Sequence, residues 1–281
     1  MSVDLHTHST ASDGTFSPAE LVALAADQNL HAIAISDHDS VSGISQAIAQ
    51  GAKSPITVIP AVEFSAIEDD LSIHILGFFI DHTDQALLDE LSLLRAGRLV
   101  RAEHMVQMLA ADGFTLDFND MVKLIDGGSL GRSHIAASLV RSGYASSLSE
   151  AFKHFVGREA PYFVPKTPVS VHEIVNIIHW AGGLAVVAHP RISGVDGLID
   201  SMIGWGIDGL EALHAEHTPA QRTFYEQIAT RHNLLISGGS DYHGPHMAGR
   251  PLGAANVPDE ILFKLADAAG QSVPASLRGR L

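Results

Sequence analysis

The sequence contains no cysteine among its 281 residues. Disulfide bonds, thiolate zinc sites and cysteine nucleophiles are therefore all excluded. Any metal site or catalytic centre must instead be built from histidine, carboxylate, hydroxyl or amide groups. The absence also fits a protein of the reducing cytoplasm, which is the location we expect.

Positive charge is scarce as well. The chain has 17 Lys and Arg against 32 Asp and Glu, which leaves a formal net charge of −15. A field of this sign repels long polyanions, so a broad binding face for long nucleic acid is excluded. A small phosphorylated substrate held by a few local cations remains compatible with it.

Long apolar runs are absent too. The longest, such as Leu184–Ala188, are far too short to cross a bilayer, and the first residues do not resemble a secretory leader. We therefore expect a soluble protein without membrane contact, and no feature predicts an obligate protein partner. The hydrophobic fraction of 46% is large enough to fill the core of one barrel-sized domain.

Short apolar runs alternate with amphipathic helical stretches over most of the chain. The predicted strands are Val3–His8, His31–Ser36, Thr57–Phe64, Ile73–Phe79, Leu184–Ala188, Gly209–Leu213 and Leu234–Ser237. The predicted helices between them include Ser17–Gln28, Val169–Ala181 and Pro219–His232. This order implies a mostly parallel sheet, and at this length it favours a distorted β/α barrel over an open sheet.

One stretch, from about Asp84 to Phe163, breaks the alternation. It contains no convincing strand, and its predicted helices are Gln85–Asp112, Phe118–Ile125, Ser133–Ser142 and Ser149–Val156. We interpret residues 84–163 as a helical insertion that determines substrate specificity. Residues 1–83 and 164–281 would then form the barrel that carries it.

The chain has 17 histidines, and several lie beside acids at the ends of predicted strands. Histidine is the commonest metal ligand, and barrel enzymes place their sites at the carboxyl ends of their strands. The segments are His6-Thr7-His8, Ser36-Asp37-His38-Asp39, Glu63, His189-Pro190 and Ser240-Asp241-Tyr242-His243, with His74 inside a strand. Each alone could be a solvated turn or a satisfied core histidine, but their recurrence at one edge indicates a metal site.

The two-residue spacing within these segments has a structural meaning. Side chains two apart on a strand point to the same face, so His6 and His8 should both face inward. If the extended path continues after the last predicted strand, Asp241 and His243 share a face in the same way. The glycines of the loop at residues 237–240 suit a backbone packed tightly around a site.

These segments, together with Asp4-Leu5 and Ser12-Asp13-Gly14, resemble the PHP (polymerase and histidinol phosphatase) superfamily. The resemblance covers nearly the whole chain in the expected order. It implies a distorted (β/α)7 barrel, TIM-like in class, with up to three metal ions. The ligands that it implies are His6, His8, Asp13, His38, Glu63, His74, His189, Asp241 and His243.

The resemblance also implies how these ligands divide among three ions. His6, His8, Glu63 and Asp241 would hold one ion; Glu63, His74 and His189 a second; and Asp13, His38 and His243 the third. Some relatives carry histidine where this chain has Asp13. Mixed imidazole and carboxylate ligation suits Mn²⁺, Fe²⁺ or Zn²⁺, and the resemblance favours Mn²⁺.

The filled site would suit phosphate chemistry. Three carboxylates among nine ligands, together with three divalent ions, leave a local net charge of about +3. The ions would act as Lewis acids on phosphoryl oxygens and lower the pKa of a bound water, which would provide a hydroxide for attack. The leaving group could be protonated by another bound water or by a histidine such as His214 or His217.

Substrate contacts are predicted in the segment Gly131-Arg132-Ser133-His134. A helix N-terminus with an Arg fork and a hydroxyl can bind an anion. The alternative interpretation is an N-cap, Ser133, beside a surface arginine. The resemblance makes Arg132, Ser133 and His134 candidate substrate contacts, and Asn176 is a weaker candidate that could equally be a solvent-exposed residue.

Three further arginines, Arg95, Arg98 and Arg101, recur at helical spacing in the insertion. The pattern predicts a solvated or salt-bridged helix face. Steering of an anionic substrate is the alternative.

The chain as a whole is similar to a bacterial PHP subgroup that removes the 3′-phosphate from nucleoside 3′,5′-bisphosphates. The predicted function is therefore a metal-dependent phosphomonoesterase that converts pAp to AMP and phosphate. A 5′→3′ exoribonuclease on short oligoribonucleotides and a histidinol phosphatase are the enzyme alternatives. A non-catalytic, metal-stabilised module is the alternative of another class.

Overall fold

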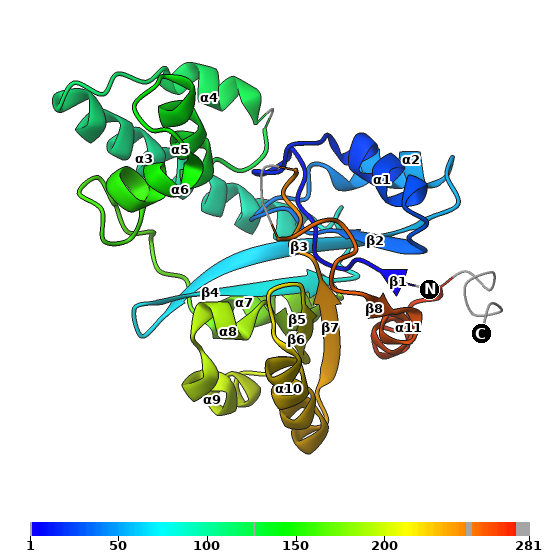
Figure 1. Ribbon diagram of the computed structural model, residues 1–281. Coiled ribbons are helices and arrows are strands. Elements are labelled where there is room, and N and C mark those ends of the chain that lie inside the picture. The colour runs from blue at the N-terminus through cyan, green and yellow to red at the C-terminus, as the bar shows by residue number, and fades with distance from the viewer. Residues whose placement is uncertain (1, 126, 246–248, 274–281) are drawn as a thin grey trace.

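The computed structural model describes residues 2–125, 127–245 and 249–273. Its centre is a curled six-stranded sheet in the order β2-β3-β4-β5-β6-β7, and β1 pairs separately with β8 (Figure 1). The strands are β1 (Ser2–Val3), β2 (Ala32–Ile35), β3 (Thr57–Glu68), β4 (Leu71–Phe78), β5 (Leu184–Val187), β6 (Gly209–His214), β7 (Leu235–Gly239) and β8 (Val257–Pro258).

Helices surround this sheet, and the group α3 to α6 extends to one side of it (Figure 1). The helices before residue 160 are α1 (Pro18–Asp27), α2 (Ile44–Gly51), α3 (Gln85–Ala111), α4 (Phe118–Leu124), α5 (Arg132–Arg141), α6 (Leu148–Ala151) and a π-helix (Phe152–Val156). The later helices are α7 (Val171–Trp180), α8 (Pro190–Ser193), a 3-10 turn (Asp196–Leu198), α9 (Ile199–Gly204), α10 (Pro219–His232) and α11 (Asp259–Ala268). In the part of the chain that the structure describes, none of these helices combines the length and apolar content that crossing a bilayer requires.

The sheet is parallel except at β4. β2 pairs with β3, β5 with β6 and β6 with β7 in parallel, whereas β4 runs antiparallel to β3 and β5. The cause is local: Asp69 and Asp70 both have positive φ, 46° and 61°, which closes β3 and β4 into a two-residue hairpin. The hairpin pairs Ser65 with His74, so the start of β4 lies beside the second half of β3.

The N-terminal segment closes the sheet into a barrel. The amide of Asp4 donates to the carbonyl of Ala32 on β2 at 3.0 Å, and the amide of Leu5 donates to the carbonyl of Gly238 on β7 at 3.2 Å. Because β2 and β7 are the two edges of the six-stranded sheet, a segment bonded to both joins them. The predicted distorted β/α barrel is thus confirmed.

Regular strand structure in this segment is shorter than predicted. Of the predicted strand Val3–His8, only β1 is regular, and isolated bridges at Asp4 and Thr7 continue the path. Gly238 and Gly239, predicted as loop, belong instead to β7, which extends beyond the predicted end at Ser237. The expected close packing does occur there, since a Cβ added to Gly239 would lie 2.4 Å from the amide nitrogen of His6.

The long helix α3 changes its packing partners halfway. Its first half contributes Leu87 and Leu91 to the hydrophobic core beside β3, β4 and α7. Its second half contributes Met105 and Leu109 to a separate hydrophobic cluster whose buried members all lie between residues 102 and 162. A division of the chain near residues 84 and 163 stays a prediction, because α3 packs on both sides of it.

Several elements were not predicted from the sequence. β8 has two residues, which is too short for an alternating pattern, and neither α2 nor α11 was expected. The predicted helix Ser149–Val156 is divided into α6 and the π-helix. α11 packs against β1, β7 and β8, and so covers the place where the barrel closes.

Candidate metal centre

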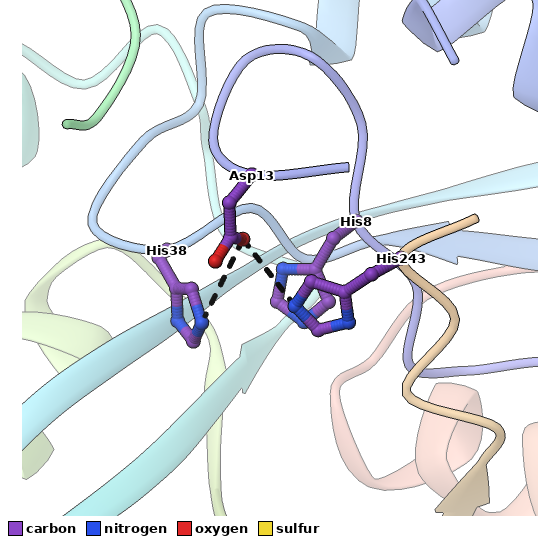
Figure 2. A group of neighbouring side chains, drawn as sticks. All are labelled: His8, Asp13, His38 and His243. Atoms are coloured by element: carbon purple, nitrogen blue, oxygen red, sulfur yellow. Dashed lines mark ion pairs between the residues drawn. The ribbon is translucent and has the colours of Figure 1, made fainter. Parts of the chain in front are cut away.

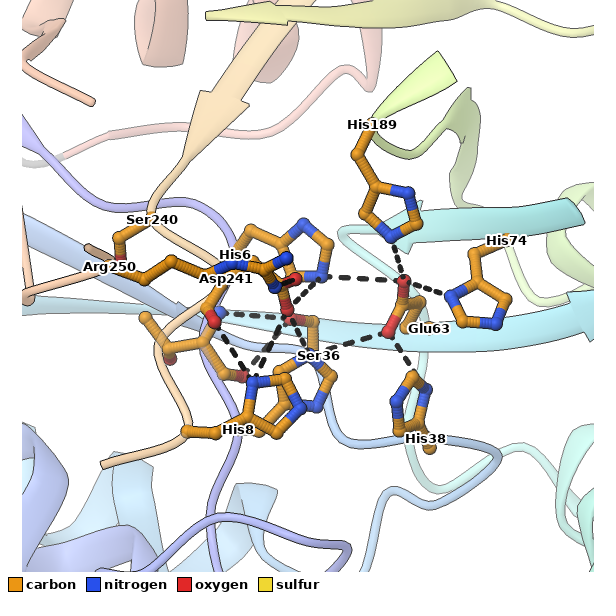
Figure 3. A network of polar contacts seen from close by, with 12 residues as sticks. His6, His8, Ser36, His38, Glu63, His74, His189, Ser240, Asp241 and Arg250 are labelled. Carbon is orange, nitrogen blue, oxygen red and sulfur yellow. Dashed lines mark hydrogen bonds and ion pairs between the residues drawn. The ribbon is translucent and has the colours of Figure 1, made fainter. Parts of the chain in front are cut away.

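The nine predicted ligands lie together at one edge of the barrel (Figures 2 and 3). They come from the segment after β1, from the loops after β2, β5 and β7, and from β3 and β4 themselves. The groups whose donor atoms lie within 4.8 Å of one another are His6, His189 and Asp241; His6, His8 and Glu63; His38, Glu63 and His74; and His8, Asp13, His38 and His243.

Glu63 of β3 lies at the centre of the cluster (Figure 3). Its carboxylate is fully buried, and its Oε1 faces Nδ1 of His74 at 2.9 Å and Nε2 of His189 at 3.1 Å. Its other oxygen, Oε2, faces Nδ1 of His38 at 2.8 Å and Nε2 of His8 at 3.3 Å. Oε1 also lies 3.4 Å from Nε2 of His6, so one carboxylate faces three imidazoles at Oε1 and two others at Oε2.

Asp241, after β7, faces the same centre from the other side. Its Oδ1 lies 3.4 Å from Nε2 of His6 and 3.2 Å from Nε2 of His8. Its Oδ2 accepts a hydrogen bond from Arg250. The extended path does not continue here, because Asp241 has φ +55°, but this left-handed residue still aims the carboxylate at the two imidazoles.

Asp13 forms a third group with two histidines (Figure 2). Its Oδ1 lies 3.3 Å from Nε2 of His243 and 3.9 Å from Nε2 of His38. The rings of His8 and His243 stack with their centroids 4.1 Å apart. His38 therefore has one ring nitrogen near this group and the other near Glu63.

Unsatisfied polar atoms show that these residues fit divalent cations. Buried side-chain atoms without a hydrogen-bond partner include His6 Nε2, His8 Nε2, His38 Nδ1, Glu63 Oε2 and Asp13 Oδ1. Leaving such an atom unpaired costs about 1–3 kcal/mol, unless another ligand satisfies it. Two ligand atoms about 2.1 Å from a shared ion lie roughly 3.0–3.4 Å apart, which is the spacing observed around Glu63.

The pKa values of two histidines favour the form that binds metal. Burial lowers the pKa of His8 to about 3, and the rings of His243 and His38 add to this shift. Burial also lowers the pKa of His74 to about 4, against the opposing effect of Glu63. Both imidazoles are therefore neutral at pH 7, as a metal ligand must be.

His243 behaves differently. Burial opposes its positive charge, but the carboxylates of Asp13 and Asp241 outweigh burial and raise its pKa to about 9. Binding of a cation beside Asp13 would therefore release a proton from His243.

Glu211 supports the cluster and was not predicted as a site residue. Its fully buried carboxylate on β6 faces Nδ1 of His6 at 3.0 Å and accepts from the amide of His189 at 2.7 Å. Burial opposes ionisation, but His6 outweighs it and lowers the pKa of Glu211 to about 2. A carboxylate behind a ligand histidine fixes the tautomer and orientation of the ring. The only signal in the sequence is an acid inside an apolar strand.

Replacing this carboxylate should weaken metal binding. Glu211→Gln keeps the size of the side chain but presents an NH₂ group to either His6 or the amide of His189. We expect divalent metal to bind about 10–100-fold more weakly, as is typical of such supporting partners. Equilibrium dialysis with metal analysis measures this. Asp208→Asn, just before β6, is the control and should leave the affinity unchanged.

Two more buried carboxylates form hydrogen bonds with serine residues of the loops, and not with the histidine rings. Asp37, within the motif noted above, accepts from the hydroxyls of Ser9 and Ser12, each at 2.6 Å. Asp4 accepts from the hydroxyl of Ser240 at 2.6 Å. The contacts of Asp37 fix the segment between His8 and Asp13, and the contact of Asp4 fixes the residue before Asp241.

A cavity of about 460 Å³ lies against the cluster of candidate metal ligands. Four predicted ligands line it, and the remaining wall includes Leu148, Phe152 and four basic residues. The ligands are Asp13, His38, His74 and His243, and the basic residues are Arg98, Arg101, Arg132 and Lys166. Lys166 was not predicted, because nothing in its local sequence distinguishes it from a surface lysine.

The predicted solvated or salt-bridged arginine face on α3 is confirmed for Arg98, which forms an ion pair, and is wrong for Arg101, which is buried without an ion pair to any described residue. Arg98 and Arg101 are only 9% and 8% exposed. Arg98 pairs with Asp39 at 2.6 Å and donates to the hydroxyl of Ser65 at 3.0 Å. The helix lies between the barrel and the second hydrophobic cluster at this point, so the face that carries Arg98 and Arg101 is buried.

The Arg98–Asp39 pair should matter for stability. Arg98→Met leaves the 3%-exposed Asp39 without its cation, and breaking a buried pair in this way costs about 3–5 kcal/mol. Urea unfolding measures the loss. The exposed pair of Arg191 and Asp196 is the control, and Arg191→Met should cost less than about 1 kcal/mol. Equal losses in the two variants would contradict the structural role of the buried pair.

The predicted substrate contacts divide into two kinds. Arg132 and Ser133 both line the cavity, and the hydroxyl of Ser133 also donates to Oδ2 of Asp13 at 2.5 Å. His134 accepts from the amide of Gly131 at 3.0 Å. Neither His134 nor Asn176 is among the residues that line the cavity. Gly131 is the N-cap of α5, so the alternative of Ser133 as N-cap is wrong.

Neither histidine suggested as a proton donor lines the cavity. His214 is fully buried, with Nε2 3.8 Å from Oδ2 of Asp241. His217 is bound through Nδ1 to the carbonyl of Ala212 at 3.0 Å. Both lie behind the ligands rather than beside the cavity.

Hydrolysis of a phosphate ester needs cations that polarise phosphoryl oxygens and further cations that hold the other anionic groups of the substrate. This cavity brings together residues suited to both tasks, at the edge where barrel enzymes place their sites. The fold and the site therefore define a metal-dependent phosphoesterase.

Comparison with known proteins agrees. Residues 4–100 match the PHP domain family model. The chain is 34% identical over 257 residues to the 3′,5′-nucleoside bisphosphate phosphatase of Chromobacterium violaceum, covering 89% of this chain and 90% of that protein. It is 35% identical over 247 residues to a 5′-3′ exoribonuclease of Haemophilus influenzae, covering 86% and 90%. A crystal structure assigned as a metal-dependent phosphoesterase from Bifidobacterium adolescentis superimposes with a TM-score of 0.88 at 32% identity, over 96% of this chain and 97% of that one.

This chain belongs to the PHP domain family. It is an enzyme of the phosphoesterase branch of that family, a hydrolase of phosphate esters.

Proposed function

We propose that this enzyme removes the 3′-phosphate from nucleoside 3′,5′-bisphosphates, converting pAp to AMP and phosphate. The observation that carries the proposal is one cavity with two regions for anions: the candidate metal ligands, and a basic wall that includes Arg101, Arg132 and Lys166. A substrate with two phosphates on one nucleoside matches this pairing. The phosphatase of C. violaceum, which is similar over most of its length, supports it.

We propose further that the nine ligands hold up to three divalent ions, Mn²⁺ before Zn²⁺ or Fe²⁺. The proposed sets are His6, His8, Glu63 and Asp241; Glu63, His74 and His189; and Asp13, His38 and His243. When bound, such ions supply Lewis acidity toward phosphoryl oxygens and an activated water near neutral pH.

The protein's own groups position the substrate. Arg132 and Lys166 would bind the second phosphate, which fixes the distance of the first from the candidate ligands. Leu148 and Phe152 offer apolar surface to the nucleoside. Ser133 acts through Asp13, whose carboxylate it orients. On this basis we propose residues 84–163 as the specificity subdomain of a barrel formed by residues 1–83 and 164–281.

Phosphate release from three nucleotides tests the function. With Mn²⁺ present, the enzyme should release phosphate from pAp at least 100-fold faster than from 5′-AMP, because only pAp places a phosphate at both regions. 3′-AMP should react at an intermediate rate. Equal rates on pAp and 5′-AMP, or no release from either, would overturn the proposal.

A 5′→3′ exoribonuclease acting on short RNA is the second candidate, favoured by the relative of H. influenzae. The same metal ligands could act on a phosphodiester, with the basic wall holding the 5′-phosphate. Mass analysis of digests of 5′-phosphorylated oligoribonucleotides separates the two functions. Release of successive 5′-nucleotides faster than phosphate release from pAp would favour the nuclease.

Arg132 should matter only for substrates with two phosphates. Its loss removes a charged hydrogen bond worth about 1.5–3 kcal/mol, so Arg132→Met should raise KM for pAp about 10–100-fold. kcat/KM for 3′-AMP should stay within a factor of about three. Arg141→Met, on the exposed face of the same helix, is the control. An equal loss of kcat/KM on both substrates would show that Arg132 maintains the structure of the site and does not bind the second phosphate.

A further inference from the structure

A second cavity, of about 270 Å³, adjoins the first. Ser65, Arg98, Arg101 and Lys166 line both cavities and form the wall between them. None of the nine candidate metal ligands lines the second cavity. It is therefore separate from the site of hydrolysis but shares the basic wall proposed to bind the second phosphate.

The far side of the second cavity is mainly apolar. Leu93, Leu94 and Val169 line it, together with the hydroxyl-bearing Thr167; the cavity also has two acids, Glu90 and Asp39, and Asp39 is paired with Arg98. Leu93 is 68% exposed, and a Cβ added to Gly97 of the same helix would meet no atom within 4 Å. No described side chain fills the space beside Gly97, because glycine has no side chain of its own to occupy it.

The shared wall carries more positive charge than its surroundings balance. Arg98 is paired with Asp39, but neither Arg101 nor Lys166 has an ion pair with any residue that the structure describes. Burial and the neighbouring arginines lower the pKa of Lys166 well below its usual range, and they lower that of Arg101 to about 9. Two basic side chains without an ion pair, placed between two cavities, can bind anionic groups from both sides.

We infer that the second cavity binds a group attached to the 5′-phosphate of the substrate. The ligand class is a nucleoside 3′-phosphate whose 5′ end continues as a pyrophosphate ester into a flexible arm that carries apolar groups. The phosphate attached to the 5′ carbon would face the first cavity, and the outer phosphate of the pyrophosphate would face the shared wall. The arm would contact Leu93, Leu94 and Val169. A volume slightly below the roughly 300–1,000 Å³ of complete ligand pockets suits part of a ligand rather than all of one. This inference rests on the proposed function.

Coenzyme A, which has a 3′-phosphate, a 5′-pyrophosphate and a flexible arm, is the test substrate beside pAp. The native enzyme should release the 3′-phosphate of both. Gly97→Phe fills the second cavity, and it should lower kcat/KM for coenzyme A at least 10-fold while leaving pAp within twofold. Gly97→Ala, which adds one methyl group, is the matched control and should leave both unchanged.

A second variant tests the inference in case Gly97→Phe fails to fold. Leu93→Glu changes an exposed side chain and places a negative charge beside the arm and pyrophosphate, so it should also impair coenzyme A selectively. Release from pAp but not from coenzyme A by the native enzyme would overturn the inference and leave the proposed function standing. So would equal effects of both variants on the two substrates. No release from pAp would overturn the proposed function itself.

Discussion

Glu63→Gln should lower kcat/KM for pAp about 1,000-fold. The carboxylate of Glu63 faces five imidazoles at 2.8–3.4 Å, three at Oε1 and two at Oε2. An amide offers one neutral acceptor and an NH₂ group, which cannot serve two ions. Loss of about 4 kcal/mol of metal-dependent stabilisation of the transition state corresponds to this factor.

Three measurements accompany this variant. Steady-state phosphate release gives the rate, plasma mass spectrometry gives the bound metal, and circular dichroism checks the fold. We expect metal content to fall by about two ions per chain, because Glu63 belongs to two of the proposed ligand sets. Glu68→Gln, on the same strand outside the site, is the control. A variant that keeps both its metal and more than a tenth of its activity would contradict the central place of Glu63.

Exhaustive chelation should abolish activity and lower thermal stability together. Buried nitrogens and oxygens without hydrogen-bond partners lie together in the cluster, and without metal they lower the free energy of unfolding. A ligand present at about 100 times its dissociation constant stabilises the folded state by about 2.7 kcal/mol. For a chain of this size we expect Tm to fall by at least about 5 °C on removal of one such ion, and further if several ions leave.

Readdition of Mn²⁺ should restore both the rate and the Tm. Chelator saturated beforehand with Mn²⁺ is the control and should change neither. A treated sample free of metal by mass spectrometry that still hydrolyses pAp at the original rate would exclude metal catalysis. Loss of stability without any measurable activity before treatment would instead indicate a structural role for the metal.

The strand ends could be predicted because they are local features. His6 and His8, the histidine and acids around position 38, and the motif at 240–243 each follow an apolar run, and a barrel brings such ends to one edge. His74 reaches the cluster for another reason, since the hairpin at Asp69 and Asp70 reverses β4. Two consecutive acids are turn formers, but the sequence alone does not show that both adopt positive φ.

The supporting residues could not be predicted, because their roles depend on distant partners. Glu211 is one acid in an apolar strand, and its meaning appears only when His6, 205 positions away, lies beside it. Arg98 and Arg101 follow a helical spacing that resembles a solvated face. Their burial depends on α3 passing between two hydrophobic clusters, which no periodicity within one helix reveals.

Two contacts connect the helical segment to the cluster of candidate metal ligands or to the residue beside it. Ser133 of α5 donates to Asp13, and Arg98 of α3 pairs with Asp39, the residue after His38. The proposed substrate wall and the candidate ligands Asp13 and His38 are therefore linked by direct side-chain contacts. Changes in the helical segment should alter the third metal group before they alter the groups around Glu63.

An anomalous-scattering map of crystals grown with Mn²⁺ tests the central claim most directly. The account predicts peaks within about 2.0–2.4 Å of both oxygens of Glu63, one of them shared with His6, His8 and Asp241, and a further peak beside Asp13. Absence of any peak within bonding distance of Glu63, in crystals of active enzyme, would contradict it.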